Sequence, residues 1–268
     1  MRQMPVTAAV IGRGVVLGYG SQMALDRSDF AIPAGGMTTL IGPNGSGKST
    51  LLNAIAGLIE PRSGSIEHPG ARDGRRSIAY VLQTTRVNPA LPITVREVVT
   101  MGRYSNRENG RRMTPDDRRA VGDAMERMGL ADLAEHHLGE LSGGQRQRVF
   151  VAQGLAQDHD MLLLDEPLTG LDLMSAQAID AVIHDETTRG CTIIMTTHDL
   201  DEAQVAGHVV LLSGRVIASG PPDLVLTAEN LSEAYGPNLL HGEGRRLFID
   251  DPAHRPVSGR HQHRDRSS

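Results

Sequence analysis

With 268 residues, 39% of them hydrophobic and 22% charged, the chain can bury a sizeable core, which excludes an intrinsically disordered protein. The net charge of -5 excludes a basic nucleic-acid-binding surface spread over the domain, and the single cysteine, Cys191, excludes an internal disulfide bond. No apolar run approaches the ~20 residues that a membrane-spanning helix needs, so any membrane contact is expected to pass through a partner chain.

The N-terminal part of the chain, residues 6 to 41, is predicted to be rich in β-strands. Short apolar or alternating runs, among them VVLGY and MTTLIG, are separated by glycine, aspartate and proline residues, as in a region of antiparallel hairpins. The first run is interpreted as an opening strand and not as a secretion signal, because Arg13 interrupts its apolar stretch and no cleavage site follows.

A glycine-rich stretch, IGPNGSGKSTLL at Ile41–Leu52, follows these runs. The pattern G-x-x-x-x-G-K-[ST] between an apolar strand and an apolar helix is that of a phosphate-binding P-loop; the alternative is a glycine turn without a ligand. Glycines let successive N–H groups turn toward an anion, Lys48 can reach the outer phosphates, and Ser49 offers a hydroxyl to Mg²⁺. The residues expected to contact a nucleoside triphosphate are Gly42, Pro43, Asn44, Gly45, Ser46, Gly47, Lys48, Ser49 and Thr50.

Helices and one strand are predicted between this loop and the next motif. STLLNAIAGLI is predicted to be a helix that stops at Pro61, and SIAYVLQ a strand that ends at Gln83. The region Thr94–Ala134 is charged and helical in character. Its clearest helix begins with Thr114 as the cap and Pro115 in the first turn.

A second glycine motif, LSGGQ, occupies Leu141–Gln145, and a helix is predicted from about Ser142 to Gln157. Two glycines and a serine at a helix start make another phosphate-binding end. One chain cannot easily bring both ends to the same γ-phosphate, so we expect two copies arranged head to tail, each lending LSGGQ to the ATP on the other's P-loop. The residues of this motif expected to contact ATP are Ser142, Gly143, Gly144 and Gln145.

Two apolar runs follow, MLLLDE and CTIIMTT, with the helical segment SAQAIDAVIHDETTRG between them. Buried strands that alternate with helices predict a parallel sheet and an α/β fold. HVVLLSGRVIASG is predicted to be a hairpin, and the polar tail is predicted to be disordered from about residue 252. Solvated disorder is also the simplest interpretation of three tail histidines that could bind a metal ion: His254, His261 and His263.

The P-loop and LSGGQ together resemble the ATP-binding cassette (ABC) family, for which LSGGQ is the signature. The resemblance covers about residues 6 to 236 and implies a P-loop NTPase core with a parallel sheet, an antiparallel β subdomain and an α-helical subdomain inserted at about 84 to 150. Residues 237 to 268 would then be a C-terminal extension. The resemblance also implies hydrolysis of ATP with Mg²⁺ bound.

The same resemblance implies roles for further residues. Asp165 and Glu166, which end MLLLDE, resemble the carboxylate that holds the Mg²⁺ water shell and the general base that polarises the attacking water; on their own they could cap a turn before Pro167. His198 resembles the switch histidine near the γ-phosphate, and Gln83 the glutamine that touches Mg²⁺ and the attacking water. The remaining matches are Tyr19, which would stack on adenine, and Asp172, in the loop that crosses the dimer interface.

A single cassette without membrane spans resembles the nucleotide-binding subunits of transporters. This implies a head-to-tail homodimer on the cytoplasmic face of the cell membrane, beneath two polytopic permease subunits, with an extracytoplasmic solute-binding protein in the system. VVTMGRYS at 98 to 105 and ASGPPDLVLTAENLSEAYG at 218 to 236 resemble the cassettes of importers for manganese, zinc or iron. The same segments resemble the cassettes of importers for ferric siderophores, haem or cobalamin less closely. The alternative from a different functional class is a soluble regulatory or nucleic-acid-associated ATPase.

Overall fold

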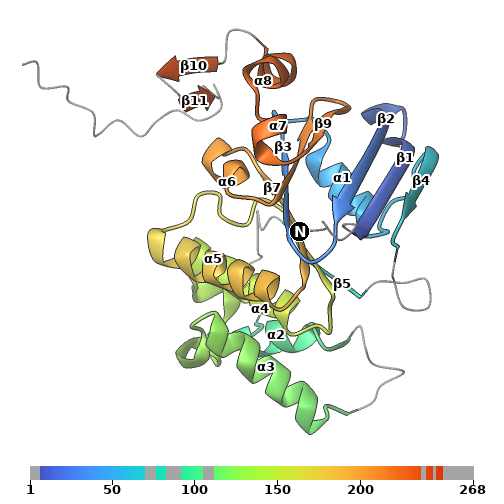
Figure 1. Ribbon diagram of the computed structural model, residues 1–268. Coiled ribbons are helices and arrows are strands. Elements are labelled where there is room, and N and C mark those ends of the chain that lie inside the picture. The colour runs from blue at the N-terminus through green and yellow to red at the C-terminus, as the bar shows by residue number, and fades with distance from the viewer. Residues whose placement is uncertain are drawn as a thin grey trace, which may run out of the picture.

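A six-stranded sheet forms the centre of the computed structural model (Figure 1). The structure describes residues 7–69, 77–82, 92–104, 112–236, 240–243 and 246–249. In order across the sheet, the strands are β5 (Ile78–Val81), β6 (Met161–Leu164), β7 (Thr192–Thr197), β3 (Met37–Ile41), β8 (His208–Leu212) and β9 (Val216–Gly220). All run parallel except β9, which is antiparallel to β8 at the edge. The predicted α/β fold with a parallel sheet is thereby confirmed.

Strand β3 belongs to this central sheet and not to the antiparallel region in which the sequence analysis placed MTTLIG. It lies between β7 and β8, with Thr39 opposite Met195 on one side and Val209 on the other. That prediction was wrong because a strand's own residues do not reveal its partners, which come from later in the chain. As a result, the predicted P-loop leaves the carboxyl end of a strand in the middle of the parallel sheet.

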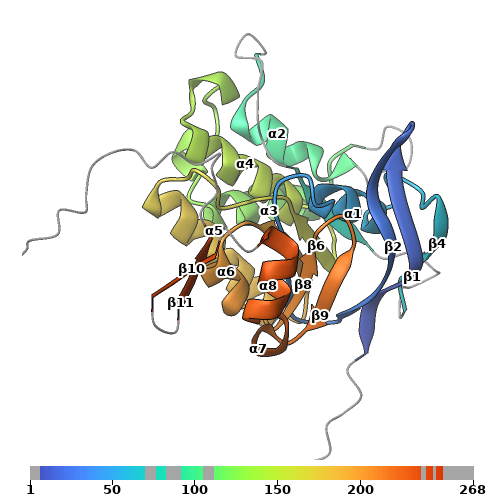
Figure 2. The same cartoon turned by 90° about the horizontal axis from the view of Figure 1, so that it is seen from above.

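A separate three-stranded antiparallel sheet lies beside helix α1 (Lys48–Ile55) in both views (Figures 1 and 2). Its strands are, in order, β2 (Gln22–Pro33), β1 (Ala8–Tyr19) and β4 (Ser63–Glu67). Apolar side chains of this sheet, of α1 and of the central sheet form one hydrophobic cluster. Helix α1 is therefore fixed between two sheets.

Successive residues of β6 face opposite sides of the central sheet. Met161 and Leu163 belong to the cluster shared with α1, whereas Leu162 and Leu164 belong to the cluster shared with the helices on the other side. All four residues are completely buried. The residues that follow Leu164 therefore emerge from a strand that is held from both faces.

A helical lobe covers the second face of the sheet, at the bottom of Figure 1. It contains α2 (Val95–Met101), α3 (Pro115–Arg127) and α4 (Gly143–Leu155), with short 3₁₀ turns at Ala131–Leu133 and Leu138–Glu140. Thr114 caps α3 and Pro115 lies in its first turn, as predicted. Helix α4 follows its cap Ser142 and ends close to the predicted position.

A buried arginine holds this lobe together. Arg103 Nε donates to Asp117 on α3, and Arg103 Nη1 donates to Asp158 and to the Ala156 carbonyl after α4, each at 2.9 Å. Hydrogen bonds from the Thr114 backbone and from Arg103 lower the pKa of Asp117 to about 2. Since a buried charge is tolerated only when it is paired, this network fixes the start of α3 against the end of α4.

Helix α1 ends at Ile55, earlier than the predicted stop at Pro61. Gly57 adopts a φ of 72°, and the Leu58 N–H donates to the Asn53 carbonyl at 2.9 Å, which closes the helix in a Schellman motif. The prediction was wrong because apolar residues continue at helical spacing after the helix has ended.

The remaining elements are α5 (Leu173–Thr188), α6 (Leu200–Gln204), α7 (Pro222–Val225), α8 (Ala228–Tyr235), β10 (Leu240–Glu243) and β11 (Arg246–Ile249). Of these, α5 packs against α4 and β7, whereas α7 and α8 pack against β8 and β9. Within the described ranges, no helix is both long and apolar enough to cross a bilayer. Several predicted features lie outside the described residues: Gln83, His254, His261, His263 and the tail from about 252.

Candidate nucleotide-binding site

The loop between β3 and α1 is closed so tightly that two of its positions accept only glycine. A Cβ on Gly42 would collide with the carbonyl oxygen of Leu212, and one on Gly47 would lie 2.6 Å from the carbonyl oxygen of Ala24. Gly47 also has a φ of 99° and is the N-cap of α1. The loop therefore sits directly on the positive end of α1, where free backbone N–H groups attract an anion.

Two polar side chains of this loop suit an anionic ligand. Lys48, the only lysine in the chain, is 6% exposed, and its Nζ donates to the carbonyls of Gly42 at 2.8 Å and Pro43 at 3.2 Å. The hydroxyl of Ser46 is buried and has no hydrogen-bond partner among the described residues. An unpaired buried hydroxyl is costly, and phosphate oxygens could satisfy it.

Asp165 joins three elements at the carboxyl edge of the sheet. It follows β6, is 5% exposed, and accepts hydrogen bonds at Oδ1 from Ser49 on α1 at 3.1 Å and from Thr196 on β7 at 2.6 Å. A carboxylate beside a hydroxyl is an all-oxygen donor set, the kind that Mg²⁺ prefers. The structure thus brings together the two described residues that the sequence analysis assigned to Mg²⁺.

Glu166 has an unusual backbone conformation. Its φ is 47°, the only positive φ of a non-glycine residue in the described part of the chain. Such a conformation costs about 1–3 kcal/mol and persists only where neighbours enforce it. Here the Glu166 N–H donates to Thr196 Oγ1 at 2.8 Å, and the next residue, Pro167, is buried.

Thr196 is a residue that the sequence analysis missed. Its hydroxyl accepts from the Glu166 backbone and donates to Asp165, so one side chain orients both acidic residues. The available signal was the threonine pair before His198 in CTIIMTTHD. That signal becomes informative only when β6 and β7 are known to be neighbours.

His198 leaves the sheet at the same edge, directly after β7. It is partly buried, and the cap of α6, Asp199, follows it. Thr197, the residue before it, donates to Glu202 at 2.5 Å, and burial raises the pKa of the Glu202 carboxyl. His198 and Glu166 therefore come from the ends of adjacent parallel strands.

Tyr19 lies at the end of β1, where it is 50% exposed. Its hydroxyl accepts a hydrogen bond from Asn53 on α1 at 3.2 Å. The ring is thus held beside α1 while half of its surface stays open, as stacking against a base would require.

The LSGGQ segment lies in a different lobe from the P-loop (Figure 1). Helix α1 packs against β1, β2 and β7, whereas α4 packs against α2, α3 and α5. Ser142 is exposed and caps α4: its hydroxyl accepts from the Gln145 N–H at 3.2 Å, and Gln145 Oε1 accepts from the Ser142 N–H at 2.8 Å. The motif is therefore a rigid, solvent-facing helix start.

Asp172 packs against this helix start within the same chain. It is the N-cap of α5 and accepts from the N–H and the hydroxyl of Ser175, both at 2.9 Å, and these bonds lower the pKa of its carboxyl. A Cβ on Gly144 would collide with Asp172 Oδ2 and lie 2.5 Å from Ser175 Oγ. Only glycine fits this contact between α4 and α5.

We therefore predict that Gly144→Ala lowers the free energy of unfolding by about 1–3 kcal/mol, because the added methyl group displaces the α5 cap. The adjacent Gly143→Ala is the control: nothing lies within 4 Å of a Cβ there, and alanine favours a helix, so it should keep or raise stability. Urea unfolding of the nucleotide-free variants measures both. Equal effects of the two substitutions would contradict the contact.

Comparison with known proteins agrees with the family resemblance that the P-loop and LSGGQ motifs indicate. The ABC transporter family matches residues 25–169. The chelated iron transport system membrane protein YfeB of Yersinia pestis is 39% identical over 81% of this chain and 75% of its own length. The zinc transport system ATP-binding protein TroB of Treponema pallidum is 38% identical over 88% and 90%, and the manganese transport system ATP-binding protein MntA of Synechocystis is 36% identical over 83% and 88%.

Solved structures share the fold. An inward-facing conformation of a putative metal-chelate type ABC transporter has a TM-score of 0.76 and 26% identity, covering 90% of this chain and 96% of the other. A dimeric post-hydrolysis state of the ATP-binding cassette MJ0796 with ADP and Pi has a TM-score of 0.68 and 27% identity, covering 80% and 98%.

Proposed function

Because the chain belongs to the ABC transporter family and is an ATP-hydrolysing cassette, we propose that it powers the import of a divalent metal ion through partner membrane subunits. The observation that carries this proposal is its likeness to ATP-binding subunits of manganese and zinc transport systems along more than four fifths of the chain. Composition and site geometry alone support only ATP hydrolysis.

We assign the residues of this site the following roles in ATP hydrolysis. The P-loop N–H groups, Lys48 and the positive end of α1 bind the phosphates, and Tyr19 stacks on adenine. Glu166 accepts a proton from the attacking water as general base, while His198 orients the γ-phosphate. Thr196 is a positioning residue, since it holds the backbone of Glu166 in its strained conformation.

Ser49 and Asp165 would hold Mg²⁺, because the exposed hydroxyl of Ser49 already lies 3.1 Å from the buried carboxylate of Asp165. A bound Mg²⁺ would neutralise charge that develops on the phosphate oxygens. Gln83 would be a further contact of Mg²⁺ and a partner of the attacking water.

We further propose a head-to-tail homodimer in which Ser142, Gly143, Gly144 and Gln145 contact the ATP on the partner's P-loop. The exposed start of α5 supports this: beside Asp172, Leu173 is 72% and Met174 73% exposed. Large apolar side chains with that exposure next to a rigid loop are typical of an interaction surface. Two membrane permease subunits, at the cytoplasmic face of the membrane, and an extracytoplasmic solute-binding protein complete the proposed system.

A metal chelate is the second candidate cargo. The relative named for chelated iron and the structural neighbour named as a metal-chelate type transporter favour it. The alternative of a soluble, non-transport ATPase has no such support.

Uptake measurements test the proposal. In cells carrying Lys48→Ala, which weakens phosphate binding, uptake of radioactive Mn²⁺, Zn²⁺ or Fe²⁺ should fall at least about tenfold. Loss of siderophore, haem or cobalamin uptake with unchanged divalent-ion uptake would support the second candidate. No change for any cargo, and no polytopic membrane protein copurifying with the tagged chain, would overturn transport altogether.

A further inference from the structure

Three side chains of different metal-binding chemistry meet in a buried place away from the P-loop. His159 follows α4, Glu186 lies near the end of α5, and Cys191 directly precedes β7. The side chains of His159 and Glu186 are 6% and 8% exposed, and Cys191 is 6% exposed. Their ligand atoms all lie within 4.8 Å of one another.

The register of the central sheet brings these three side chains together. Met161 of β6 pairs with Thr192 of β7, so the residues before these two strands are neighbours. The Cys191 N–H donates to the Glu186 carbonyl at 3.0 Å, which fixes the turn between α5 and β7. The three ligand groups are therefore held by the backbone of the central sheet.

The imidazole of His159 is oriented as in metal sites. Its Nδ1 lies 2.8 Å from the carbonyl oxygen of Gln157, so a proton on Nδ1 is donated there and leaves the lone pair on Nε2. Nε2 is buried and completes no hydrogen bond within the described residues. It lies 3.3 Å from Glu186 Oε2.

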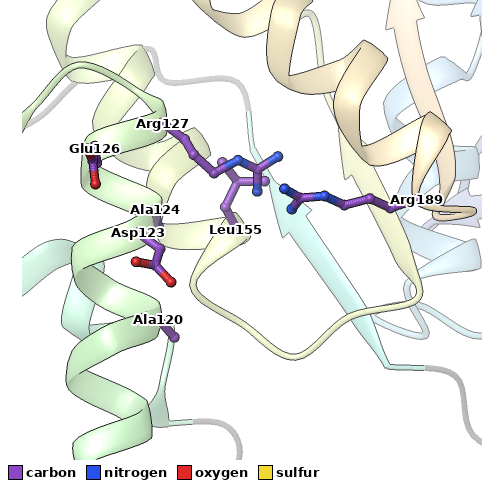
Figure 3. Close-up of a pocket in the computed structure, with 7 residues that line it drawn as sticks. All are labelled: Ala120, Asp123, Ala124, Glu126, Arg127, Leu155 and Arg189. Atoms are coloured by element: carbon purple, nitrogen blue, oxygen red, sulfur yellow. The ribbon is translucent and has the colours of Figure 1, made fainter.

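The carboxylate of Glu186 is also held by outer partners. Its Oε1 accepts from Arg127 Nη2 at 2.7 Å and from Arg189 Nη1 at 3.3 Å, which leaves Oε2 toward His159. These two arginines line a cleft of about 480 Å³. Figure 3 shows their side chains pointing toward one another. Hydrogen-bonded carboxylates of this kind are common around bound metals.

We propose that His159 Nε2, Glu186 Oε2 and Cys191 Sγ bind one borderline divalent cation of the Zn²⁺ type. Nitrogen, carboxylate oxygen and thiolate are the ligands that Zn²⁺ accepts in tetrahedral sites, whereas Mg²⁺ and Mn²⁺ prefer oxygen alone. The ligand atoms must draw together by about 1 Å to reach tetrahedral spacing, and water would supply the fourth ligand. The site is independent of the transported cargo.

The charges of the ligands suit a divalent ion. Because the ligands must be deprotonated, a cation that enters would release the proton of the Cys191 thiol and any proton on His159 Nε2 to solvent. The thiolate and the Glu186 carboxylate would then offset the two positive charges of the ion within the buried cluster.

Cobalt(II) provides a direct test, because Co²⁺ occupies Zn²⁺ sites and its bond to a thiolate gives a near-ultraviolet charge-transfer band. Cys191 is the only cysteine, so this band reports on one site. Titration of the chelator-treated full chain should give a band that saturates at one equivalent and disappears on addition of Zn²⁺. Absence of the band would overturn the proposal, since a purely structural His159–Glu186 ion pair predicts none.

Substitutions of the proposed ligands test which residues bind the ion. Cys191→Ser should abolish the band, and His159→Gln should weaken Co²⁺ binding at least about tenfold. His184→Gln, which removes an exposed histidine of the same helix as Glu186, is the matched control and should change nothing. A band that survives His159→Gln at full affinity would contradict the three-ligand site.

A measurement on the unaltered chain covers the case in which a variant does not fold. Zn²⁺ should slow the reaction of Cys191 with a thiol reagent at least about tenfold, while Mg²⁺ should have no effect. Equal rates with and without Zn²⁺ would overturn the proposal.

Discussion

Glu166→Gln is expected to lower the rate of ATP hydrolysis by about 100- to 10,000-fold while ATP binding is retained. This is the range over which a general base contributes to catalysis. Glutamine keeps the size and the hydrogen-bonding atoms of the side chain but cannot accept a proton from water at neutral pH. The loss should appear in the turnover rate and not in the affinity for ATP.

The conformation of Glu166 makes this substitution informative. Its φ of 47° is equally unfavourable for glutamine and glutamate, so the change adds no backbone strain. The bond from the Glu166 N–H to Thr196 involves the backbone and also survives. A change in rate can therefore be assigned to the carboxylate.

Steady-state phosphate release measures the rate, and titration with a fluorescent ATP analogue measures binding. Light scattering should show that the variant accumulates as an ATP-bound dimer, because the step that separates the two copies is blocked. Asp201→Asn, at an exposed carboxylate on α6, should keep the parental rate. Sustained turnover by Glu166→Gln would remove Glu166 from the role of base.

The P-loop could be predicted from the sequence because its chemistry is local. Gly42, Gly47 and Lys48 lie within a few residues of one another, and a steric argument about the backbone suffices to expect an anion site. The same holds for the cap of α3 at Thr114, where the residue type and the following proline carry the signal. Whether a segment forms a helix or a strand was predictable for the same reason.

Features that depend on the pairing of distant strands could not be predicted. The joint role of Thr196 toward Asp165 and Glu166 exists only because β6 and β7 are neighbours. The same pairing brings His159 beside Cys191, although each residue alone resembles an ordinary buried side chain. Strand β3 was misplaced for the related reason that its neighbours β7 and β8 come from much later in the chain.

Ser142→Arg is expected to abolish ATP hydrolysis by the homodimer, with losses of at least about 100-fold, although each chain keeps an intact P-loop. Ser142 is exposed at the start of α4, in a different lobe from α1, so a large charged side chain there should block only the surface that we propose faces a second copy. Loss of the cap itself costs only about 1 kcal/mol, which leaves the chain folded. Binding of ATP to the isolated subunit should be unchanged.

Mixing this variant with Lys48→Ala chains tests the head-to-tail arrangement. In a mixed dimer, one site combines the intact Lys48 of the first chain with the intact Ser142 of the second, and both lesions fall in the other site. With Glu166→Gln added to both chains to prevent hydrolysis, differently tagged mixed dimers should retain about one ATP each, against two in dimers that carry Glu166→Gln alone.

The matched control pairs Ser142→Arg with a chain that carries both Ser142→Arg and Lys48→Ala. No composite site is then intact, so mixed dimers should hold no ATP between their two chains, although every substitution is also present in the first experiment. If both mixtures behave alike, the two motifs do not act across an interface. Retention in the first mixture alone requires that Ser142 act on ATP bound by the other chain, since neither variant has both groups within one chain.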